Sequence, residues 1–288
     1  MKICLECGAR YETGWECPGC RRSPPSIDGR LAFAPGLATS SEGFKERYFS
    51  DLAPLEASNF WFRARNDLIV WALRRYFPLA SSFLEIGCGT GFVIAGIASE
   101  FQGMRLSGSE IFSAGLEFAA RRVPRATFFQ MDARRTPFEE EFDIIGAFDV
   151  IEHIREDEQV LAQMFKAVAA GGGIVLTVPQ HAFLWSRADE VACHVRRYEV
   201  SELKRKVTAA GFRIERCTSF VSLLLPLMFA SRMMKRDRTA DYDEMSEFRI
   251  GALANRVLEG IMAAERALIR AGIAFPMGGS LLLVARKP

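Results

Sequence analysis

The sequence predicts an α/β fold in which strands and helices alternate around a mostly parallel sheet. Short apolar runs recur between segments of helical periodicity, and the run over residues 142–148 is almost uninterrupted, as in a strand buried on both faces. A second observation is the glycine-rich turn of residues 87–91, which follows an apolar run and precedes helix-compatible sequence. Strand, tight turn and helix in this order form the unit from which parallel α/β sheets are built.

The composition limits the classes of protein to consider. The 288 residues are 49% hydrophobic and 25% charged, which is ordinary for a globular chain with a substantial core. A net charge of +2 gives no strong field that would draw the molecule to nucleic acid or anionic lipid. The N-terminus lacks an apolar signal segment, and the longest uncharged apolar run, residues 217–231, is too short to span a membrane. We therefore expect a cytoplasmic protein.

Four cysteines near the N-terminus form two Cys-x-x-Cys pairs, Cys4 with Cys7 and Cys17 with Cys20. In a chain without a secretion signal, this spacing favours a tetrahedral metal site over disulfides. A segment this short cannot bury a core, so bound zinc would supply its folding energy. We predict a zinc ribbon over residues 1–24, which could also contact a protein partner; the alternative is a redox pair or a chance cluster.

Residues 25–43 are rich in proline, glycine and serine and predict a linker, which leaves residues 44–288 as the main domain. An aromatic segment, Phe60-Trp61-Phe62, begins a helical pattern that carries Arg65 and stops before Pro78. An amphipathic helix with solvated arginines explains most of this segment.

The glycine-rich turn is the part of the chain best suited to bind a ligand. Gly87, Gly89 and Gly91 allow the backbone to approach a ligand that a Cβ would push away. A helix that begins there points unpaired N–H groups toward the turn. The third glycine comes one residue earlier than in the G-x-G-x-x-G of dinucleotide sites, and Glu85 precedes the first by two. The alternative is a strand–turn–helix that binds nothing.

Two carboxylates follow the next two predicted strands. Glu110 ends the first, where a carboxylate can accept hydrogen bonds from both hydroxyls of a ribose, and Asp132 follows the second. An exposed acid at a strand end is the alternative for Glu110. The predicted strands cover residues 82–86, 104–109, 126–130, 142–148, 174–178, 212–219 and 280–286, with helices over residues 92–101, 113–122, 157–169 (ended by the glycines at 171–173) and 201–210.

All three histidines follow predicted strands: His153 after the fourth, and His181 and His194 in the polar loop after the fifth. Ligands of open α/β sheets bind at the carboxyl ends of the strands, so these imidazoles are candidates to take a proton from a substrate. We favour His153 and His194 over His181. The alternative is that each is a structural histidine.

The glycine-rich turn, Glu110, Asp132, the Asp149-to-His153 block and the late last strand together resemble the class I S-adenosylmethionine (SAM)-dependent methyltransferases of the ubiquinone-biosynthesis and type 11 kind. The resemblance covers about residues 60–220 and the last strand. It implies a Rossmann-like sheet of seven strands in the order 3-2-1-4-5-7-6, with strand seven antiparallel. It also implies that Arg65 binds the SAM carboxylate, that Asp132 binds the adenine amino group, and that the cofactor site includes Glu85, Gly87, Cys88, Gly89, Gly91, Glu110, Ile111, Ala133 and Phe148.

We therefore expect SAM-dependent methyl transfer to a small molecule, with O-methylation favoured. One alternative is an rRNA or tRNA base methyltransferase that contacts RNA through the zinc ribbon; the near-neutral charge and the absence of an Asn-Pro-Pro-Tyr segment after residues 142–148 argue against a nucleic-acid partner. A second alternative is a module that binds SAM and zinc without catalysis.

Residues 221–279 form an insert before the last strand and predict two helices. The first part is apolar and is followed by arginines and a lysine. The two helices either pack on each other over the sheet edge or form an apolar lid. The lid would contact a lipid-like acceptor or a membrane surface through residues 220–236, which would make the protein peripheral to the membrane.

Asp149, Glu152 and His153 have the i, i+3, i+4 spacing of one helical face. With His194 they could hold a divalent ion. The block resembles the Glu-x-x-Glu-His segment of small-RNA 2′-O-methyltransferases, which binds a catalytic metal, although here the first acid is Asp. The alternative is that Asp149 lines the SAM pocket while Glu152 and His153 cap the next turn.

Overall fold

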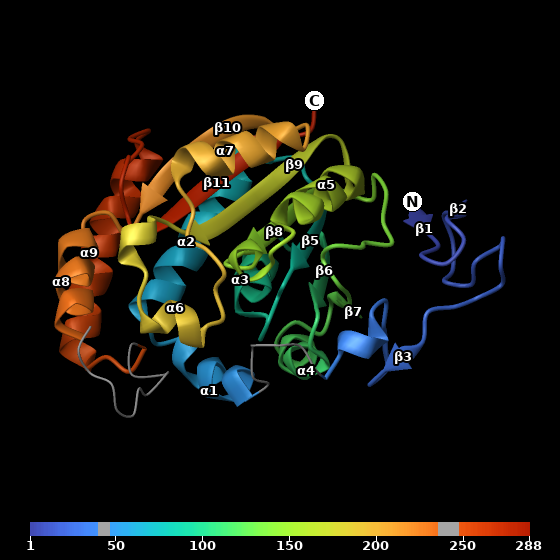
Figure 1. The fold of residues 1–288 in the computed structure, drawn as a ribbon, viewed down its shortest axis with the longest axis horizontal. Coiled ribbons are helices and arrows are strands. Elements are labelled where there is room, and N and C mark those ends of the chain that lie inside the picture. Colours follow the sequence, from blue (N-terminus) through green and yellow to red (C-terminus); the bar gives the residue numbers. More distant parts are fainter. Residues whose placement is uncertain (40–46, 236–247) are drawn as a thin grey trace.

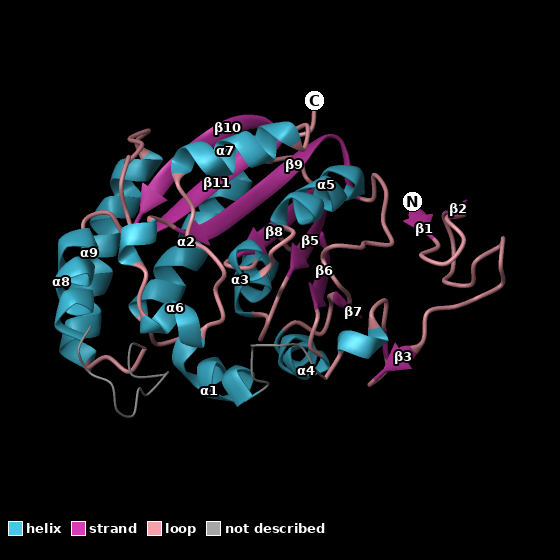
Figure 2. Cartoon of the chain, viewed as in Figure 1, coloured by secondary structure: helices cyan, strands magenta, loops and turns pink. Residues whose placement is uncertain are grey.

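A seven-stranded sheet with helices on both faces forms the centre of the protein (Figures 1 and 2). The computed structural model describes residues 1–39, 47–235 and 248–288. The strands of this sheet are β5 (Ser82–Ile86), β6 (Arg105–Glu110), β7 (Thr127–Gln130), β8 (Phe142–Phe148), β9 (Val168–Pro179), β10 (Arg213–Phe220) and β11 (Ser280–Arg286). The helices are α1 (Arg47–Glu56), α2 (Phe60–Tyr76), α3 (Phe92–Glu100), α4 (Ser113–Arg122), α5 (Asp157–Ala167), α6 (Arg187–Val191), α7 (Val200–Ala209), α8 (Leu225–Lys235) and α9 (Ala252–Arg270), with 3-10 turns η1 (Pro35–Leu37), η2 (Ile151–His153) and η3 (Ala182–Leu184).

The strand order is β10-β11-β9-β8-β5-β6-β7. Strands β5 to β9 are parallel, and β11 runs antiparallel to both β9 and β10. Numbered along the sheet-forming part of the chain, this is 3-2-1-4-5-7-6 with the seventh strand antiparallel. The predicted Rossmann-like fold is therefore confirmed.

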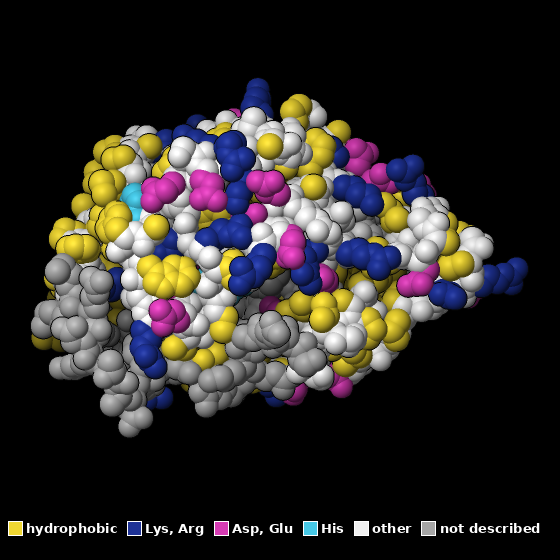
Figure 3. All heavy atoms as spheres, viewed as in Figure 1, with side chains coloured by type: hydrophobic (Ala, Val, Ile, Leu, Met, Phe, Trp, Pro, Cys, Tyr) yellow, Lys and Arg dark blue, Asp and Glu magenta, His cyan; other side chains and the backbone are white. Residues whose placement is uncertain are grey.

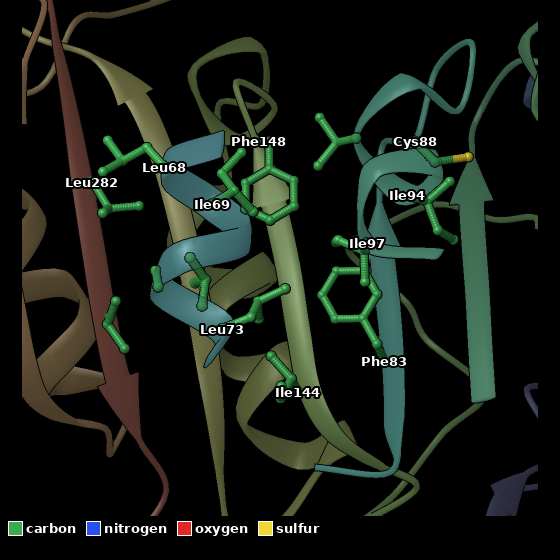
Figure 4. Packing of buried hydrophobic residues seen from close by; sticks show 14 of the residues in the cluster. Leu68, Ile69, Leu73, Phe83, Cys88, Ile94, Ile97, Ile144, Phe148 and Leu282 are labelled. Carbon is green, nitrogen blue, oxygen red and sulfur yellow. The ribbon is translucent and has the colours of Figure 1, made fainter. Parts of the chain in front are cut away.

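Strand residues alternate between two apolar layers, as the period of a β-strand requires. Leu282 and Val284 face the layer that α2, α3, α4 and α9 cover, whereas Leu281 and Leu283 face the layer under α5 and α7. Figure 4 shows side chains of α2 and α3 packed against β5, β8 and β11 in the first layer. Both faces of the sheet are therefore buried under helices.

The predicted glycine stop after α5 is wrong. The helix ends at Ala167, and strand β9 begins at Val168 and runs through the glycines. Gly173 pairs with Arg286 of β11, and a Cβ there would lie 2.2 Å from the backbone oxygen of Ala285 and 2.6 Å from the Phe77 ring. The glycine is needed for this close approach within the sheet.

The N-terminal segment contains two short hairpins, β1 (Lys2–Ile3) with β2 (Arg10–Tyr11) and β3 (Ser26–Ile27) with β4 (Arg30–Leu31). It lies against edge strand β7 (Figure 1), where Ala32 and Gln130 form a parallel bridge. The ring of Trp15 lies 5.2 Å from that of Phe33 and 5.6 Å from that of Phe129. The predicted linker thus holds β3, β4 and η1 and contacts the main sheet.

The two helices of the insert have different neighbours. Helix α9 packs along α2, with Met262 and Ile269 fully buried. Helix α8 contacts the loop after β9: Phe229 packs on Phe183 at 6.2 Å between ring centroids, and Arg232 pairs with Asp189 at 3.3 Å. No helix within the described ranges is both long and apolar enough to cross a membrane. The insert's residues 236–247, including the last residue of the predicted membrane-contacting segment, and the start of the predicted main domain at residue 44 lie outside the described residues.

Candidate active site

The turn after β5 has the backbone that its glycines allow. Gly87 and Gly91 have φ of 68° and 78°, in the left-handed region. A Cβ added to Gly87 would lie 2.5 Å from the Val150 side chain, and a Cβ added to Gly91 would lie 2.7 Å from the Cα of Ala119. Gly91 precedes the first residue of α3, so the N-terminus of this helix faces the turn. Glycine is needed at both positions because of the left-handed backbone and because a Cβ would collide with the Val150 side chain or with the backbone of Ala119.

Glu110 connects the end of β6 to this turn. Its carboxylate accepts hydrogen bonds from the backbone N–H of Gly89 (3.0 Å) and of Ile111 (2.8 Å). Burial raises the pKa of Glu110 above its ordinary value, and these N–H groups oppose the shift. A carboxylate has about four lone-pair sites, so the group can still accept hydrogen bonds from a ligand.

Glu85 lies in the core of the sheet at the same edge. It is 2% exposed, and its Oε2 has no hydrogen-bond partner among the described residues. Burial raises the pKa of Glu85 well above its ordinary value, and the nearby positive charge of Arg65 offsets this only in part. An orphaned buried carboxyl oxygen is typical of a site that is completed by a ligand.

The other predicted cofactor residues differ in what they present. Asp132 follows β7 and is held by the Arg134 guanidinium, with an Oδ2–Nη2 distance of 2.8 Å. The side chains of Cys88 and Phe148 belong to the apolar layer under α2 and α3 (Figure 4). The backbone N–H of Cys88 donates to Ser109 O, and its carbonyl accepts from the N–H of Gly91. Ala133 is buried, and Ile111 is half-buried beside Glu110.

Arg65 and Asp149 form an ion pair that joins α2 to the end of β8. The Arg65 side chain is almost fully buried and stacks on Trp61, 4.4 Å from the ring centroid. Asp149 has φ of 57°, a left-handed backbone that is unusual for a residue other than glycine. The arginine predicted to bind the SAM carboxylate therefore binds a protein carboxylate in this structure.

The structure brings His153 and His194 together and adds Glu152 to them. The two imidazole rings lie 4.8 Å apart between centroids, and His194 Nε2 is 4.0 Å from Glu152 Oε1. Burial, together with the neighbouring His194, lowers the pKa of His153 to about 3, so this ring is neutral at pH 7. Burial and the negative charge of Asp149 raise the pKa of Glu152 well above its ordinary value.

Asp189 orients His194. It accepts a hydrogen bond from His194 Nδ1 at 2.9 Å and pairs with Arg197 at 2.7 Å and with Arg232 at 3.3 Å. Burial alone would raise the pKa of Asp189, but the hydrogen bond from His194 and the charge of Arg197 lower it below its ordinary value. The bond at Nδ1 leaves Nε2 of His194 directed at Glu152.

His181 stands apart from this cluster. It follows β9, its Nδ1 lies 3.2 Å from Glu199 Oε2, and its ring stacks on Phe183 at 4.8 Å. Sequence analysis assigned no role to Asp189, Arg197 or Arg232. The charged residues of the loop after β9 gave a partial signal, but Arg232 comes from α8, and only the folded chain brings it to Asp189.

The four N-terminal thiols converge. Cys4 Sγ lies 3.6 Å from Cys20 Sγ, and Cys7 Sγ lies 3.5 Å from Cys17 Sγ. All four sulfur atoms are within 4.8 Å of one another, so the group could hold a metal ion. Four bonds of about 2.3 Å in a tetrahedron would place thiolates about 3.8 Å apart, close to these separations.

Comparison with known proteins agrees with this site. Residues 83–172, from β5 into β9, match the family described as "Methyltransferase domain". A probable S-adenosylmethionine-dependent methyltransferase of Mycolicibacterium smegmatis is 25% identical over 56% of this chain and 62% of its own length. A trans-aconitate 2-methyltransferase of Paracidovorax citrulli is 31% identical over 35% of this chain and 40% of its own length. The chain thus aligns with less than two thirds of each of these relatives.

Among solved structures, the complex between the Haloferax volcanii Trm112 methyltransferase activator and a methyltransferase contains a chain with a TM-score of 0.58. The likeness covers 86% of this chain and 100% of that one at 14% identity, so it concerns the fold alone. The segment around the glycine-rich turn is therefore similar to methyltransferase domains, as the sequence motifs predicted.

Proposed function

We propose that this chain is a class I SAM-dependent methyltransferase whose acceptor reacts beside the Glu152–His153–His194 cluster. The observation that carries the proposal is the bonding of Glu110 to the Gly89 turn within a segment that matches a methyltransferase domain. This arrangement sets a buried carboxylate beside a glycine-lined helix N-terminus, which suits a nucleoside with a charged tail.

The residues present fit SAM. Among the described residues, a Cβ at Gly89 would meet the Phe49 ring alone, at 3.7 Å, which is an ordinary contact and leaves room for a ligand. Glu110 would accept hydrogen bonds from ribose hydroxyls, and Glu85, two residues before the turn, has a buried oxygen without a hydrogen-bond partner among the described residues. SAM supplies a methyl group activated by its sulfonium charge, so no covalent bond to the enzyme is needed. Binding of SAM, measured by calorimetry, tests the proposal. Substitution of Glu110 should lower SAM affinity more than any other single change proposed here.

O-methylation is the acceptor chemistry that the cluster suits best. As the bond from the acceptor oxygen to the methyl carbon forms and the carbon–sulfur bond breaks, the hydroxyl proton has to leave. His153 is held neutral by burial, and the Nε2 of His194 is set toward Glu152 by Asp189. The Nε2 of His194 can take the proton, whereas the lowered pKa of His153 suits its ring to binding an ion that promotes loss of the proton.

An apolar surface beside this cluster supports a lipid-like acceptor. Hydrophobic side chains gather where α8 and α9 lie, on the left of Figure 3. Leu227 and Phe229 of α8 are 58% and 44% exposed, and Phe229 packs on Phe183 of the loop after β9. Helix α8 thus joins the apolar surface to the loop that carries Asp189 and His194. We infer that this surface receives an apolar substrate or a membrane that contains it.

Replacing Leu227 or Phe229 with aspartate should reduce binding to phospholipid vesicles in flotation by about tenfold. Burial of a large apolar side chain contributes about 1.5–3 kcal/mol, and an aspartate would oppose it. Leu79, which is 94% exposed in the turn after α2, is the matched control, and its aspartate variant should float like the wild type. A wild-type protein that does not float, or equal loss in the Leu79 variant, would contradict the assignment.

We propose that Cys4, Cys7, Cys17 and Cys20 hold one structural zinc ion. Elemental analysis should find one equivalent of zinc less per chain when Cys17 and Cys20 are both changed to serine. Substitution of Cys217, which is remote in sequence from these thiols, should leave the zinc content unchanged. An unchanged zinc content in the double variant would show that the thiols hold no zinc.

A further inference from the structure

We infer that Glu152, His153 and His194 form a binding site for one divalent cation of the zinc, manganese or iron(II) class. The site lies at the carboxyl edge of the sheet. Glu152 and His153 belong to η2, which follows β8, and His194 belongs to the loop after β9. Its role in acceptor activation rests on the proposed methyl transfer, whereas the binding of the ion does not.

The ligand atoms are already close together. One carboxylate oxygen of Glu152 and one nitrogen each from His153 and His194 lie within 4.8 Å of one another. Bonds of about 2.0–2.2 Å to a shared ion would set such atoms about 3–3.5 Å apart. The 4.0 Å between His194 Nε2 and Glu152 Oε1 therefore needs only a small contraction to accept an ion.

The carboxylate of Glu152 has no hydrogen-bond partner among the described residues. The residue is fully buried, and neither carboxylate oxygen has a hydrogen-bond donor within the described part of the chain. The two nearest guanidinium groups are used elsewhere, Arg65 by Asp149 and Arg197 by Asp189. Burial of an unpaired carboxylate is costly, and coordination of a cation is one of the few ways to offset it.

The surroundings of His194 are those of a metal-binding histidine. Its Nδ1 is bonded to Asp189, which is 1% exposed and is fixed in turn by Arg197 and by the backbone N–H of Ser186 at 2.8 Å. A carboxylate behind an imidazole fixes the tautomer and presents the other nitrogen to the ion. Asp189, held by the backbone N–H of Ser186, therefore orients His194 before any ion is bound.

The structure changes the ligand set expected from the sequence. Asp149, the first acid of the block, turns to Arg65 and is not part of the cluster, and His194 supplies the third ligand. Two imidazoles and one carboxylate suit borderline transition-metal ions better than Mg²⁺ or Ca²⁺, which prefer oxygen ligands. Three protein ligands leave coordination positions open, and an acceptor oxygen could occupy one of them.

Mn²⁺ is the probe that distinguishes this site from the thiols, because Mn²⁺ favours oxygen and nitrogen ligands. Full-length protein, treated with chelator and titrated with Mn²⁺ under electron paramagnetic resonance detection, should bind one ion per chain. His194→Ala should weaken binding at least tenfold, and Asp189→Asn should weaken it by about 10- to 100-fold through the orientation of His194. His181→Ala is the matched histidine control and should bind as the wild type does.

Glu152→Gln removes the charge at nearly constant volume and keeps the test usable if the alanine variant does not fold. Competition with Zn²⁺ in the same samples would establish which ion binds more tightly. Absence of Mn²⁺ and Zn²⁺ binding outside the four thiols, or binding that none of the three variants weakens, would overturn the inference. SAM affinity is measured in parallel: ion binding without SAM binding would overturn the proposed function alone, and SAM binding without an ion would overturn this site alone.

Discussion

Replacing Glu110 with alanine should weaken SAM binding by roughly 10- to 150-fold in calorimetry. The reason is the loss of hydrogen bonds to a charged, buried acceptor, which contribute about 1.5–3 kcal/mol. The same carboxylate also bonds the N–H groups of Gly89 and Ile111, so the variant loosens the turn on which the cofactor would rest. Both effects act in the same direction.

Glu265 provides the matched control. Like Glu110 it is a buried carboxylate that accepts hydrogen bonds from backbone N–H groups, here those of Ser222 at 2.6 Å and Leu223 at 2.7 Å, but it lies in α9. Glu265→Ala should lower the thermal unfolding temperature without changing SAM affinity in the folded protein. Equal SAM affinity in the Glu110 and Glu265 variants would remove Glu110 from the site and weaken the proposed function with it.

The strand ends that carry the site follow from local sequence. A parallel strand buried on both faces is an apolar run, so the residue after it, such as Glu110 or Asp149, is placed at the carboxyl edge by pattern alone. The order of the strands and the antiparallel last strand came from resemblance to a family, because pairing between distant strands has no local signal. The glycines after α5 show the limit of such a signal, since a helix stop and a close strand contact both require glycine.

The protein partners of Arg65 and His194 at the carboxyl edge could not be predicted from the sequence, although the approach of His153 to His194 was expected. Arg65 carries one charge that either a ligand or a protein acid can satisfy, and the fold selects Asp149, 84 residues away. The support of His194 likewise depends on Asp189, and one of the other partners of Asp189, Arg232, comes from a separate helix. Spacing along the chain predicts neither contact, because the first joins α2 to the end of β8 and the second joins α8 of the insert to the loop after β9.

The N-terminal segment also contacts the site in a way that composition did not indicate. Gln130, fully buried at the end of β7, accepts from Ala34 N at 3.0 Å and donates from Nε2 to Ala34 O and to Ile111 O, each at 2.8 Å. The backbone N–H of Ser113 donates to Ala38 O at 3.1 Å. Residues 32–38 are therefore bonded to the ends of the two strands that carry Glu110 and Asp132.

Deleting residues 1–38 should weaken SAM binding strongly, whereas deleting residues 1–24 should remove the metal and leave SAM binding in place. The longer deletion leaves several buried polar groups near Gln130 without hydrogen-bond partners. Each such group costs about 1–3 kcal/mol of folding free energy. Gln130→Met, which keeps the volume and removes the side-chain hydrogen bonds, should lower SAM affinity in the full-length chain and tests the same contact if the longer deletion does not fold. Calorimetry of the three variants, with circular dichroism as the control for folding, measures this. Full SAM affinity in both the 1–38 deletion and Gln130→Met would mean that these contacts only anchor the N-terminus.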